Sequence, residues 1–322
     1  RSRKAFARPA VYRRYTVKKT GFLPSLWEDL RKHKGLYLML LPIVIFYLVF
    51  CYYPMYGAQI AFRDFSPKLG TVGSPWVGLK HFKEFFNSVY FGRLIRNTLG
   101  INLKNLVFGF PAPILLALML NEVRSDKFKK TVQTVSYLPH FISTVVIAGM
   151  ILQFTSTDGF ITQLMTLFGF PKQNMMMNPD FFQPVYVISD IWQGIGWGSI
   201  IYIAAISGIS AELYEAARID GAGRWKQALH VTIPGILPTI ITMLILRIGN
   251  MMSLGFEKII LLYNSSIYET ADVISTYVYR KGLLDQSYSF STAVGLFNSM
   301  INLLLLVAAN RICKRVTEHS LW

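Results

Sequence analysis

Six runs of apolar residues divide this chain, and little besides a bundle of membrane-crossing helices can accommodate them all. A helix needs about 20 predominantly apolar residues to cross a bilayer. Hydrophobic residues make up 52% of the 322 residues and charged residues only 16%, well below the share in soluble domains. We therefore predict an all-α membrane protein with six transmembrane helices in one domain. The predicted helices cover residues 35–53, 98–120, 131–154, 184–208, 233–254 and 289–310.

The basic residues lie at the ends of these runs, where they orient the chain in the membrane. Eleven of the 33 Lys and Arg residues fall within residues 1–34, and the loop 121–130 carries four more. Loops 155–183 and 255–288 are less basic for their length. Because cytoplasmic loops carry the excess of Lys and Arg, both termini and the loop around residues 209–232 are predicted to be cytoplasmic. The long loop 54–97 is moderately basic, which weakens this rule locally without reversing it.

This orientation divides the chain into a basic cytoplasmic extension (1–34), a six-helix transmembrane domain (35–310) and a cytoplasmic tail (311–322). The net charge of +16 suits a surface of anionic lipid, because the cations sit at segment ends and not on one soluble face. We expect no nucleic-acid partner. The two cysteines are far apart, and no CxxC, HExxH or GxxxxGK[ST] pattern occurs. We expect no metal and no cofactor on this chain, so ATP and Mg²⁺ would be bound by another chain.

A polar stretch, Ser210–Pro238, interrupts the apolar runs and is predicted to form a helix, a glycine turn and a second short helix. Ser210 is a suitable N-cap, and Glu212 falls in the first turn, where a negative charge is favourable. Gly221 and Gly223 end the first helix, and Pro234 and Pro238 open the next apolar run. Physical reasoning alone leaves two interpretations equally open: a docking surface for another protein, or an ordinary amphipathic connector between two spans.

The same stretch resembles the EAA motif in permease subunits of type I binding-protein-dependent ABC importers. The match comprises Glu215-Ala216-Ala217, Asp220-Gly221-Ala222, Pro234 and Pro238 in order and spacing. In that family the motif forms a coupling helix that docks in a groove of a cytoplasmic ATPase. The resemblance therefore implies that Glu215, Ala216, Ala217, Arg218, Asp220 and Gly221 couple this chain to an ATPase dimer. It further implies a second, homologous permease subunit and an extracytoplasmic solute-binding protein as partners.

The outer loop 54–97 resembles that of oligo- and polysaccharide importers, including the aldouronate and alginate types, so we expect a saccharide cargo. Buried ionisable groups cost roughly 2.5–3.5 kcal/mol in a bilayer and usually face protein or water. Asp190, Gln193 and Trp197 share one helix face, which suits sugar hydroxyls and a sugar ring face. Arg247 and Asn250 share another face, and Asn298 lies in the last run. We predict that these residues line the substrate pathway, although Asp and Asn side chains also serve helix packing.

Acidic and neutral saccharides remain open as cargo. An outer loop with a net positive charge attracts anions, and the Arg247 guanidinium matches a carboxylate with two parallel hydrogen bonds. Asp190 would repel an anion unless a cation such as Arg247 paired with it. Uronate chains such as alginate and neutral oligosaccharides are therefore both retained. The cations of the loop are Arg63, Lys68, Lys80, Lys83, Arg93 and Arg96, against Asp64 and Glu84.

Two other classes of function compete with a transporter subunit. A membrane-embedded enzyme, such as a glycosyltransferase, would need a metal-ligand pair, an acid pair or a nucleophile motif, and the sequence offers none that is convincing. A stand-alone carrier or channel would work without a partner, whereas a permease subunit would purify with an ATPase. The sequence favours the permease subunit and a non-enzymatic role.

Overall fold

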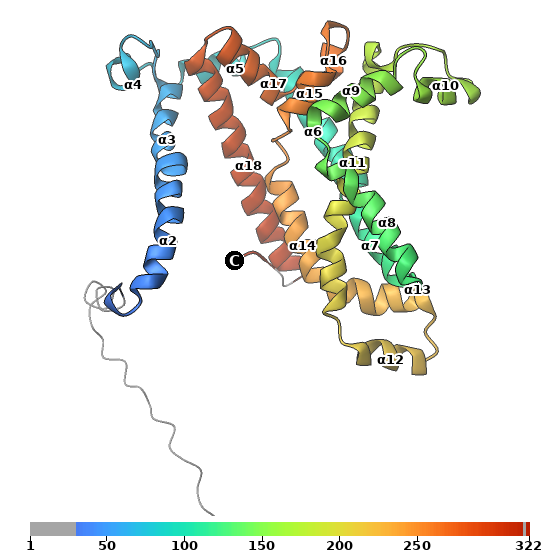
Figure 1. The fold of residues 1–322 in the computed structure, drawn as a ribbon. Helices are drawn as coiled ribbons and strands as arrows, with labels where there is room; N and C mark the ends of the chain where they lie inside the picture. The colour runs from blue at the N-terminus through green and yellow to red at the C-terminus, as the bar shows by residue number, and fades with distance from the viewer. Residues whose placement is uncertain (1–29, 318–319) are drawn as a thin grey trace, which may run out of the picture. The chain divides into compact units, whose positions relative to one another are not determined.

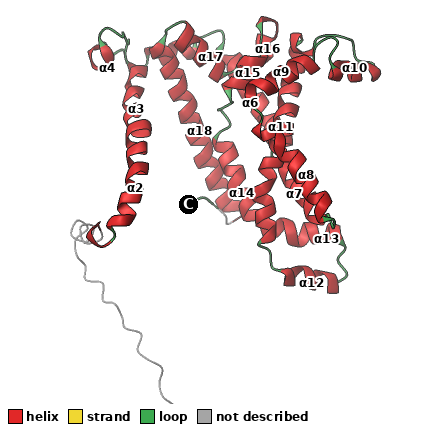
Figure 2. Ribbon diagram, viewed as in Figure 1, coloured by secondary structure: helices red, strands yellow, loops and turns green. Residues whose placement is uncertain are grey.

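The computed structural model describes residues 30–317 and 320–322. The chain forms two compact units, Arg1–Gly57 and Ala58–Trp322. Within the described residues, all regular structure is helical apart from one isolated bridge between Arg63 and Trp76 (Figures 1 and 2). The prediction of an all-α fold is therefore confirmed. Most of the expected N-terminal extension lies outside the described residues.

The first unit contributes an apolar helical stretch that continues to Phe62. It comprises α2 (Lys34–Phe46), a π-helical turn (Tyr47–Tyr52), α3 (Tyr53–Met55) and a 3-10 turn (Tyr56–Phe62). The 29 residues Lys34–Phe62 are long and apolar enough to cross a membrane, and α2 buries none of its residues. A helix that is apolar on every side is stable only where lipid or protein surrounds it.

The second unit contains the remaining helices, which are joined by short connections. Their bounds are α4 (Gly70–Gly73), α5 (Lys80–Phe86), α6 (Phe91–Lys104), α7 (Pro111–Glu122), α8 (Asp126–Tyr137), α9 (Thr144–Phe154), α10 (Phe160–Leu167), α11 (Pro179–Ser207), α12 (Ala211–Ile219), α13 (Arg224–Gln227), α14 (Ile233–Gly249), α15 (Phe256–Leu262), α16 (Tyr268–Ala271), α17 (Ile274–Tyr279) and α18 (Tyr288–Thr317).

Helix α11 runs through the middle of this unit and contacts helices from both earlier and later parts of the chain. It packs most extensively against α7, and also against α8 and α14, while α14 packs against α18 (Figure 1). One apolar core lies between α6, α9, α11 and α15 and includes the fully buried Phe182 and Ile259. A second lies between α5, α6, α17 and α18 and includes Phe85. The first core fixes α11 and α15, and α14 packs against α11, so that these three helices surround the polar residues described below.

The spans agree with the sequence in number but not always in form. Among the described residues, four helical stretches are long and apolar enough to cross a membrane, and the total reaches six if each of two bent pairs is one span. The prediction of one continuous helix over 131–154 is wrong, because Asp126–Phe141 and Thr144–Phe154 meet at 100°. Pro139 places the chain in a 3-10 turn, and Ser143 caps the next helix by accepting from the Val146 N–H. The bend separates the amphipathic α8 from the apolar α9.

Gly196 lets α11 and α8 approach each other closely. It is buried, and a Cβ at this position would lie 2.1 Å from the carbonyl oxygen of Ser136. We predict that Gly196→Ala destabilises the protein by about 1–3 kcal/mol, because the two helix backbones must separate. The measurement is the midpoint of thermal unfolding of the purified protein. Gly194→Ala on the same helix is the matched control, since a Cβ there meets nothing within 4 Å. Equal midpoints for the two variants would contradict the prediction.

Candidate functional site

The stretch from Ser210 forms the predicted helix and glycine turn. The Ser210 hydroxyl accepts a hydrogen bond from the Glu212 N–H at 3.3 Å, which caps α12. Helix α12 ends at Ile219, and Gly221 has a φ of +74°, a conformation that glycine adopts without strain. The turn therefore reverses the chain at the place that the sequence indicated.

The second helix of this stretch is not a separate short helix, as predicted, but the start of the fifth span. Helix α13 continues through a π-helical turn (Ala228–Thr232) into α14, so that Arg224–Gly249 forms one helical stretch of 26 residues. Pro234 has no backbone N–H to donate. It directly follows the π turn, where the regular pattern of helical hydrogen bonds is already interrupted. Pro234 and Pro238 thus lie inside a continuous helix instead of opening it.

Helix α12 stands away from the rest of the second unit and exposes most of its side chains (Figure 1). It buries none of its residues, and its attachment includes a hydrogen bond between the hydroxyls of Tyr214 and Thr232 at 3.0 Å. Leu213 and Ile219 are exposed hydrophobic residues. Of the six predicted coupling residues, Ala217 is half-buried and the other five are exposed: Glu215, Ala216, Arg218, Asp220 and Gly221.

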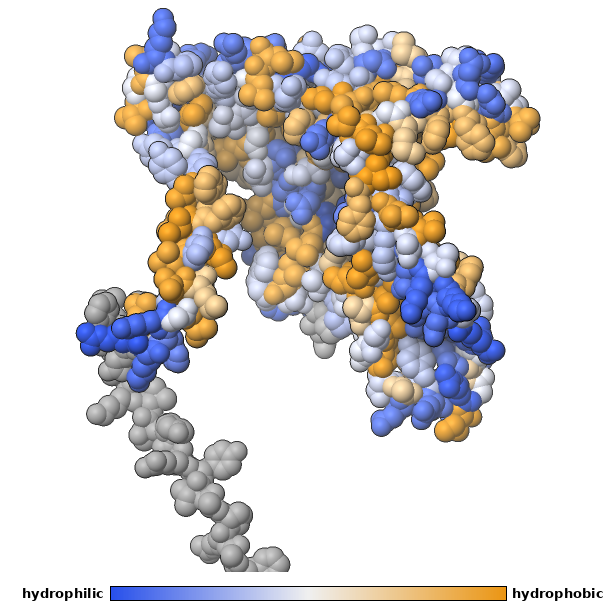
Figure 3. Space-filling view, in the orientation of Figure 1, coloured by the Kyte–Doolittle hydropathy of each residue, from blue (hydrophilic) through white to orange (hydrophobic). Residues whose placement is uncertain are grey.

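A polar cavity of about 280 Å³ lies between α6, α11, α14 and α15, and it contains three of the predicted pathway residues. Asp190 and Gln193 come from α11 and Arg247 from α14. Asp190 and Arg247 also line an adjoining cavity of about 370 Å³, together with Asn250. Figure 3 shows polar surface between α18 and α11, inside an otherwise apolar belt. A polar recess at this place suits a hydrophilic cargo.

Lys258 is a charged residue of this cavity that the sequence did not single out. Its ammonium nitrogen lies 3.7 Å from a carboxylate oxygen of Asp190 and 5.1 Å from the centre of the Tyr186 ring. The side chain is only 7% exposed, and burial lowers the pKa of the Lys258 ammonium while Asp190 opposes that shift. The suggested pairing of Asp190 with Arg247 is therefore wrong, because the ion pair of Asp190 is with Lys258.

The remaining pathway residues lie elsewhere or make helix contacts. Trp197 stacks on His140, with ring centroids 4.6 Å apart and planes inclined by 2°, and it lines neither cavity. Asn298 is half-buried on α18 and also lies outside both cavities. The Asn250 amide donates to the Leu246 carbonyl of its own helix. The two cavities thus bring together Asp190, Gln193, Arg247 and Asn250. The Trp197 indole, which we expected to cover a sugar ring, lies outside both.

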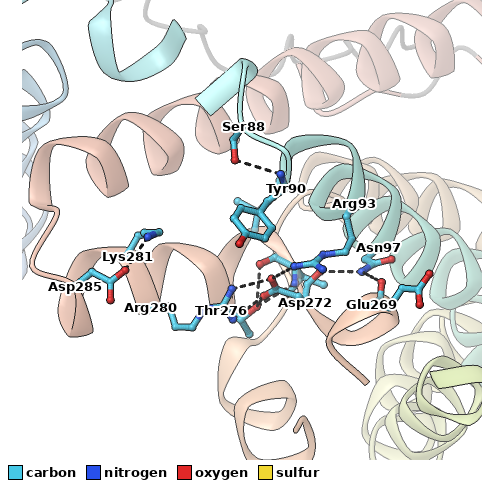
Figure 4. A network of polar contacts seen from close by, with 12 residues as sticks. Ser88, Tyr90, Arg93, Asn97, Glu269, Asp272, Thr276, Arg280, Lys281 and Asp285 are labelled. Carbon is cyan, nitrogen blue, oxygen red and sulfur yellow. Dashed lines mark hydrogen bonds and ion pairs between the residues drawn. The ribbon is translucent and has the colours of Figure 1, made fainter. Parts of the chain in front are cut away.

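A second polar cluster, the Asp272 network, lies at the end of this unit away from α12 (Figures 1 and 4). The fully buried Asp272 carboxylate accepts two hydrogen bonds from Arg280, at 2.8 and 3.0 Å, and others from Thr276 and Arg93. Burial alone would lower the pKa of Arg280, but its hydrogen bonds to Asp272 raise it overall. The network ties α6 to the segment around α17, which follows α15 and its Lys258.

Known proteins resemble this chain over most of its length. Residues 109–318 match the family described as binding-protein-dependent transport system inner membrane component. The chain is 46% identical to the polygalacturonan/rhamnogalacturonan transport system permease protein YteP of Bacillus subtilis (strain 168) over 292 residues, which are 90% of this chain and 91% of YteP.

Two solved structures share the fold over almost the whole chain. One is a bacterial ABC transporter involved in the import of the acidic polysaccharide alginate; the TM-score is 0.84, the identity 45%, and the match covers 91% of this chain and 99% of that one. The other is a bacterial alginate ABC transporter in complex with an alginate pentasaccharide-bound periplasmic protein; the TM-score is 0.84, the identity 44%, and the coverage 92% and 99%. The chain therefore belongs to the family of inner membrane components of binding-protein-dependent transport systems.

Proposed function

We propose that this chain is the permease subunit of an ATP-driven importer of acidic polysaccharide. The observation that supports the cargo class is the polar cavity in which Lys258 pairs with Asp190 and Arg247 can meet a carboxylate, with Glu257 as the other acid of the lining. Arg247 is an exposed residue that lines both cavities, and guanidinium binds carboxylate through two parallel hydrogen bonds. The similar transport proteins are named for polygalacturonan and for alginate, and both of these polysaccharides are polymers of uronic acids.

The charge of the outer loop supports this cargo less than its sequence suggested. Arg63 donates to the carbonyls of Val72 and Ser74, Lys80 pairs with Asp64 at 3.0 Å, and Arg93 belongs to the Asp272 network. Half of the six cations counted in that loop are thus engaged within the protein. The selectivity for acidic cargo therefore rests on the cavity rather than on long-range attraction by the loop.

The partners follow from the transport family. A second permease subunit would complete the membrane core, a cytoplasmic ATPase dimer would bind ATP and Mg²⁺, and an extracytoplasmic solute-binding protein would deliver the saccharide. The exposed α12, with Glu215 to Gly221, would dock on the ATPase. Both termini and α12 would then be cytoplasmic, residues 1–34 and 311–322 would flank the transmembrane domain of residues 35–310, and the bilayer would surround its apolar helices.

Transport would arise because the ATPase and the cargo favour different states of the same helices. ATP would close the ATPase dimer and move both docked helices, and α14 would transmit this movement because it is continuous with α13. The cavity around Arg247 would then open alternately to the two sides. The coupling free energy between the two sites is reciprocal, so cargo delivered to the membrane core should stimulate ATP hydrolysis.

Substrate-stimulated ATP hydrolysis by the assembled, reconstituted complex tests the cargo class. We expect stimulation by a uronate oligomer loaded on the binding protein, and much weaker stimulation by a neutral glucan of the same length. Arg247→Gln should raise the half-maximal uronate concentration roughly tenfold, because a hydrogen bond to a charged group contributes about 1.5–3 kcal/mol. Arg311→Gln, at an exposed cation outside the cavities, is the control. Stimulation by the neutral glucan alone would overturn the acidic cargo.

A further inference from the structure

An apolar cavity of about 470 Å³ lies beside α10 and belongs to neither polar cavity. Its walls come from α9, α10 and α11, and its volume falls within the range of small-molecule pockets. Ile147 and Ile151 form part of the α9 wall, Ile161 and Met165 the α10 wall, and Pro184 and Ile188 part of the α11 wall.

The polar groups in its walls offer water little to bind. The Thr155 hydroxyl donates to the Ile151 carbonyl at 2.6 Å, and the Ser189 hydroxyl donates to the Tyr186 carbonyl at 2.8 Å. Asp180 is the one charged residue of the lining. Water enters a cavity only where it finds two to four polar partners. An apolar occupant therefore suits this cavity better than water.

Helix α10 has the character of a helix that lies in a membrane interface. Phe160, Leu164, Leu167 and Phe168 follow helical spacing and are exposed, the last two at 81% and 74%. Its polar Gln163 donates to the Asp158 carbonyl, and Asp158 pairs with Lys172 at 2.7 Å. Figure 3 shows apolar surface on α10 beside polar surface in the same region. An amphipathic helix of this kind rests at the boundary of headgroups and acyl chains.

We propose that this cavity holds one acyl chain of a phospholipid from the leaflet in which α10 rests. The apolar side chains of α10 adjoin its mouth, where Ile188 is 66% exposed, so the cavity opens onto the surface that the bilayer must cover. The exposed Lys172–Asp158 pair lies in the loops on either side of α10 and would be available to a lipid headgroup. The bound chain fills the space between α9 and α11 and thereby braces the bent α8–α9 pair.

The test is photo-crosslinking of the assembled complex in phosphatidylethanolamine–phosphatidylglycerol vesicles that contain a phospholipid with a diazirine in one acyl chain. Mass spectrometry of the digest should find lipid adducts on residues 147–154 and 184–192 several-fold above those on α18, whose Met300 and Leu303 are also exposed. Met165→Trp and Ile188→Trp fill the cavity and should remove this excess while leaving adducts on α18 unchanged.

Leu164→Trp is the matched control, because Leu164 is exposed on the same helix and does not line the cavity. It should keep the wild-type pattern of adducts. Equal labelling of all exposed apolar helices would overturn the proposal, as would an excess that survives both filling variants. A benzoylphenylalanine at Met165 that crosslinks to a protein chain instead of lipid would also overturn it, since the occupant would then be an apolar helix.

Discussion

Glu215→Ala and Gly221→Val are each expected to abolish transport while the chain still inserts into the membrane. Glu215 is exposed on α12, so under the proposed function its loss would remove a contact with the ATPase and leave the fold intact. Gly221 has a positive φ, and a side chain there costs about 1–2 kcal/mol in backbone strain without a clash, since a Cβ meets nothing within 4 Å. The turn would relax and reorient α12 relative to α14.

Transport and substrate-stimulated ATP hydrolysis of reconstituted complexes measure this effect, and the amount of chain recovered from membranes reports insertion. Gly223→Val is the matched control, because Gly223 has a φ of −68° and a Cβ there also meets nothing within 4 Å. It should transport at close to the wild-type rate. If both Glu215→Ala and Gly221→Val kept wild-type activity, α12 would have no coupling role, whatever the cargo.

Asp272→Ala is expected to cause the largest loss of stability in the second unit. The carboxylate is fully buried and accepts hydrogen bonds from two arginines and Thr276 (Figure 4). Its removal leaves Arg93 and Arg280 partly buried without their anion. Breaking a buried ion pair by deleting one partner typically costs about 3–5 kcal/mol.

The exposed Lys281–Asp285 pair gives the comparison, since it spans one helical turn at 2.8 Å close to the same network (Figure 4). Asp285→Ala should cost only about 0.3–0.5 kcal/mol, the usual worth of such surface pairs. Thermal unfolding midpoints of the purified protein distinguish the two. A midpoint for Asp272→Ala as high as that of Asp285→Ala would show that the network contributes little.

Local patterns predicted those parts of the fold that depend on neighbours in sequence. The length of the apolar runs indicated six spans, and Ser210 and Gly221 marked the ends of α12 correctly, because capping and glycine turns are short-range effects. The sequence does indicate the bend after Pro139, because a serine that can cap a helix follows this proline four residues later. The prediction of one continuous helix gave more weight to the hydrophobicity of residues 131–154. Hydropathy measures burial in lipid and is insensitive to the direction of the helix axis.

The candidate site was harder to predict because it depends on contacts between distant helices. Asp190 and Gln193 were found from their helical spacing, but Lys258 lies 68 positions after Asp190 and was counted only as a loop cation. A signal existed in Phe256–Leu262, where Glu257 and Lys258 are the charged residues of an otherwise apolar helix. Trp197 shows the converse: its spacing matched the polar face, but its stacking partner, His140, comes from another segment, and its pathway role stays a prediction.

The π turn between α13 and α14 has a consequence for the direction in which Arg247 points. An α-helix rotates by about 100° per residue, so every added residue changes the heading of all side chains that follow. The turn at Ala228–Thr232 contains one such addition, between α13 and the guanidinium of Arg247. Deleting a single residue there would swing Arg247 by about 100° away from Asp190 and Lys258 with every side chain unchanged. The helical phase of this one segment sets the direction in which Arg247 points relative to α13, and so whether it faces the polar cavity.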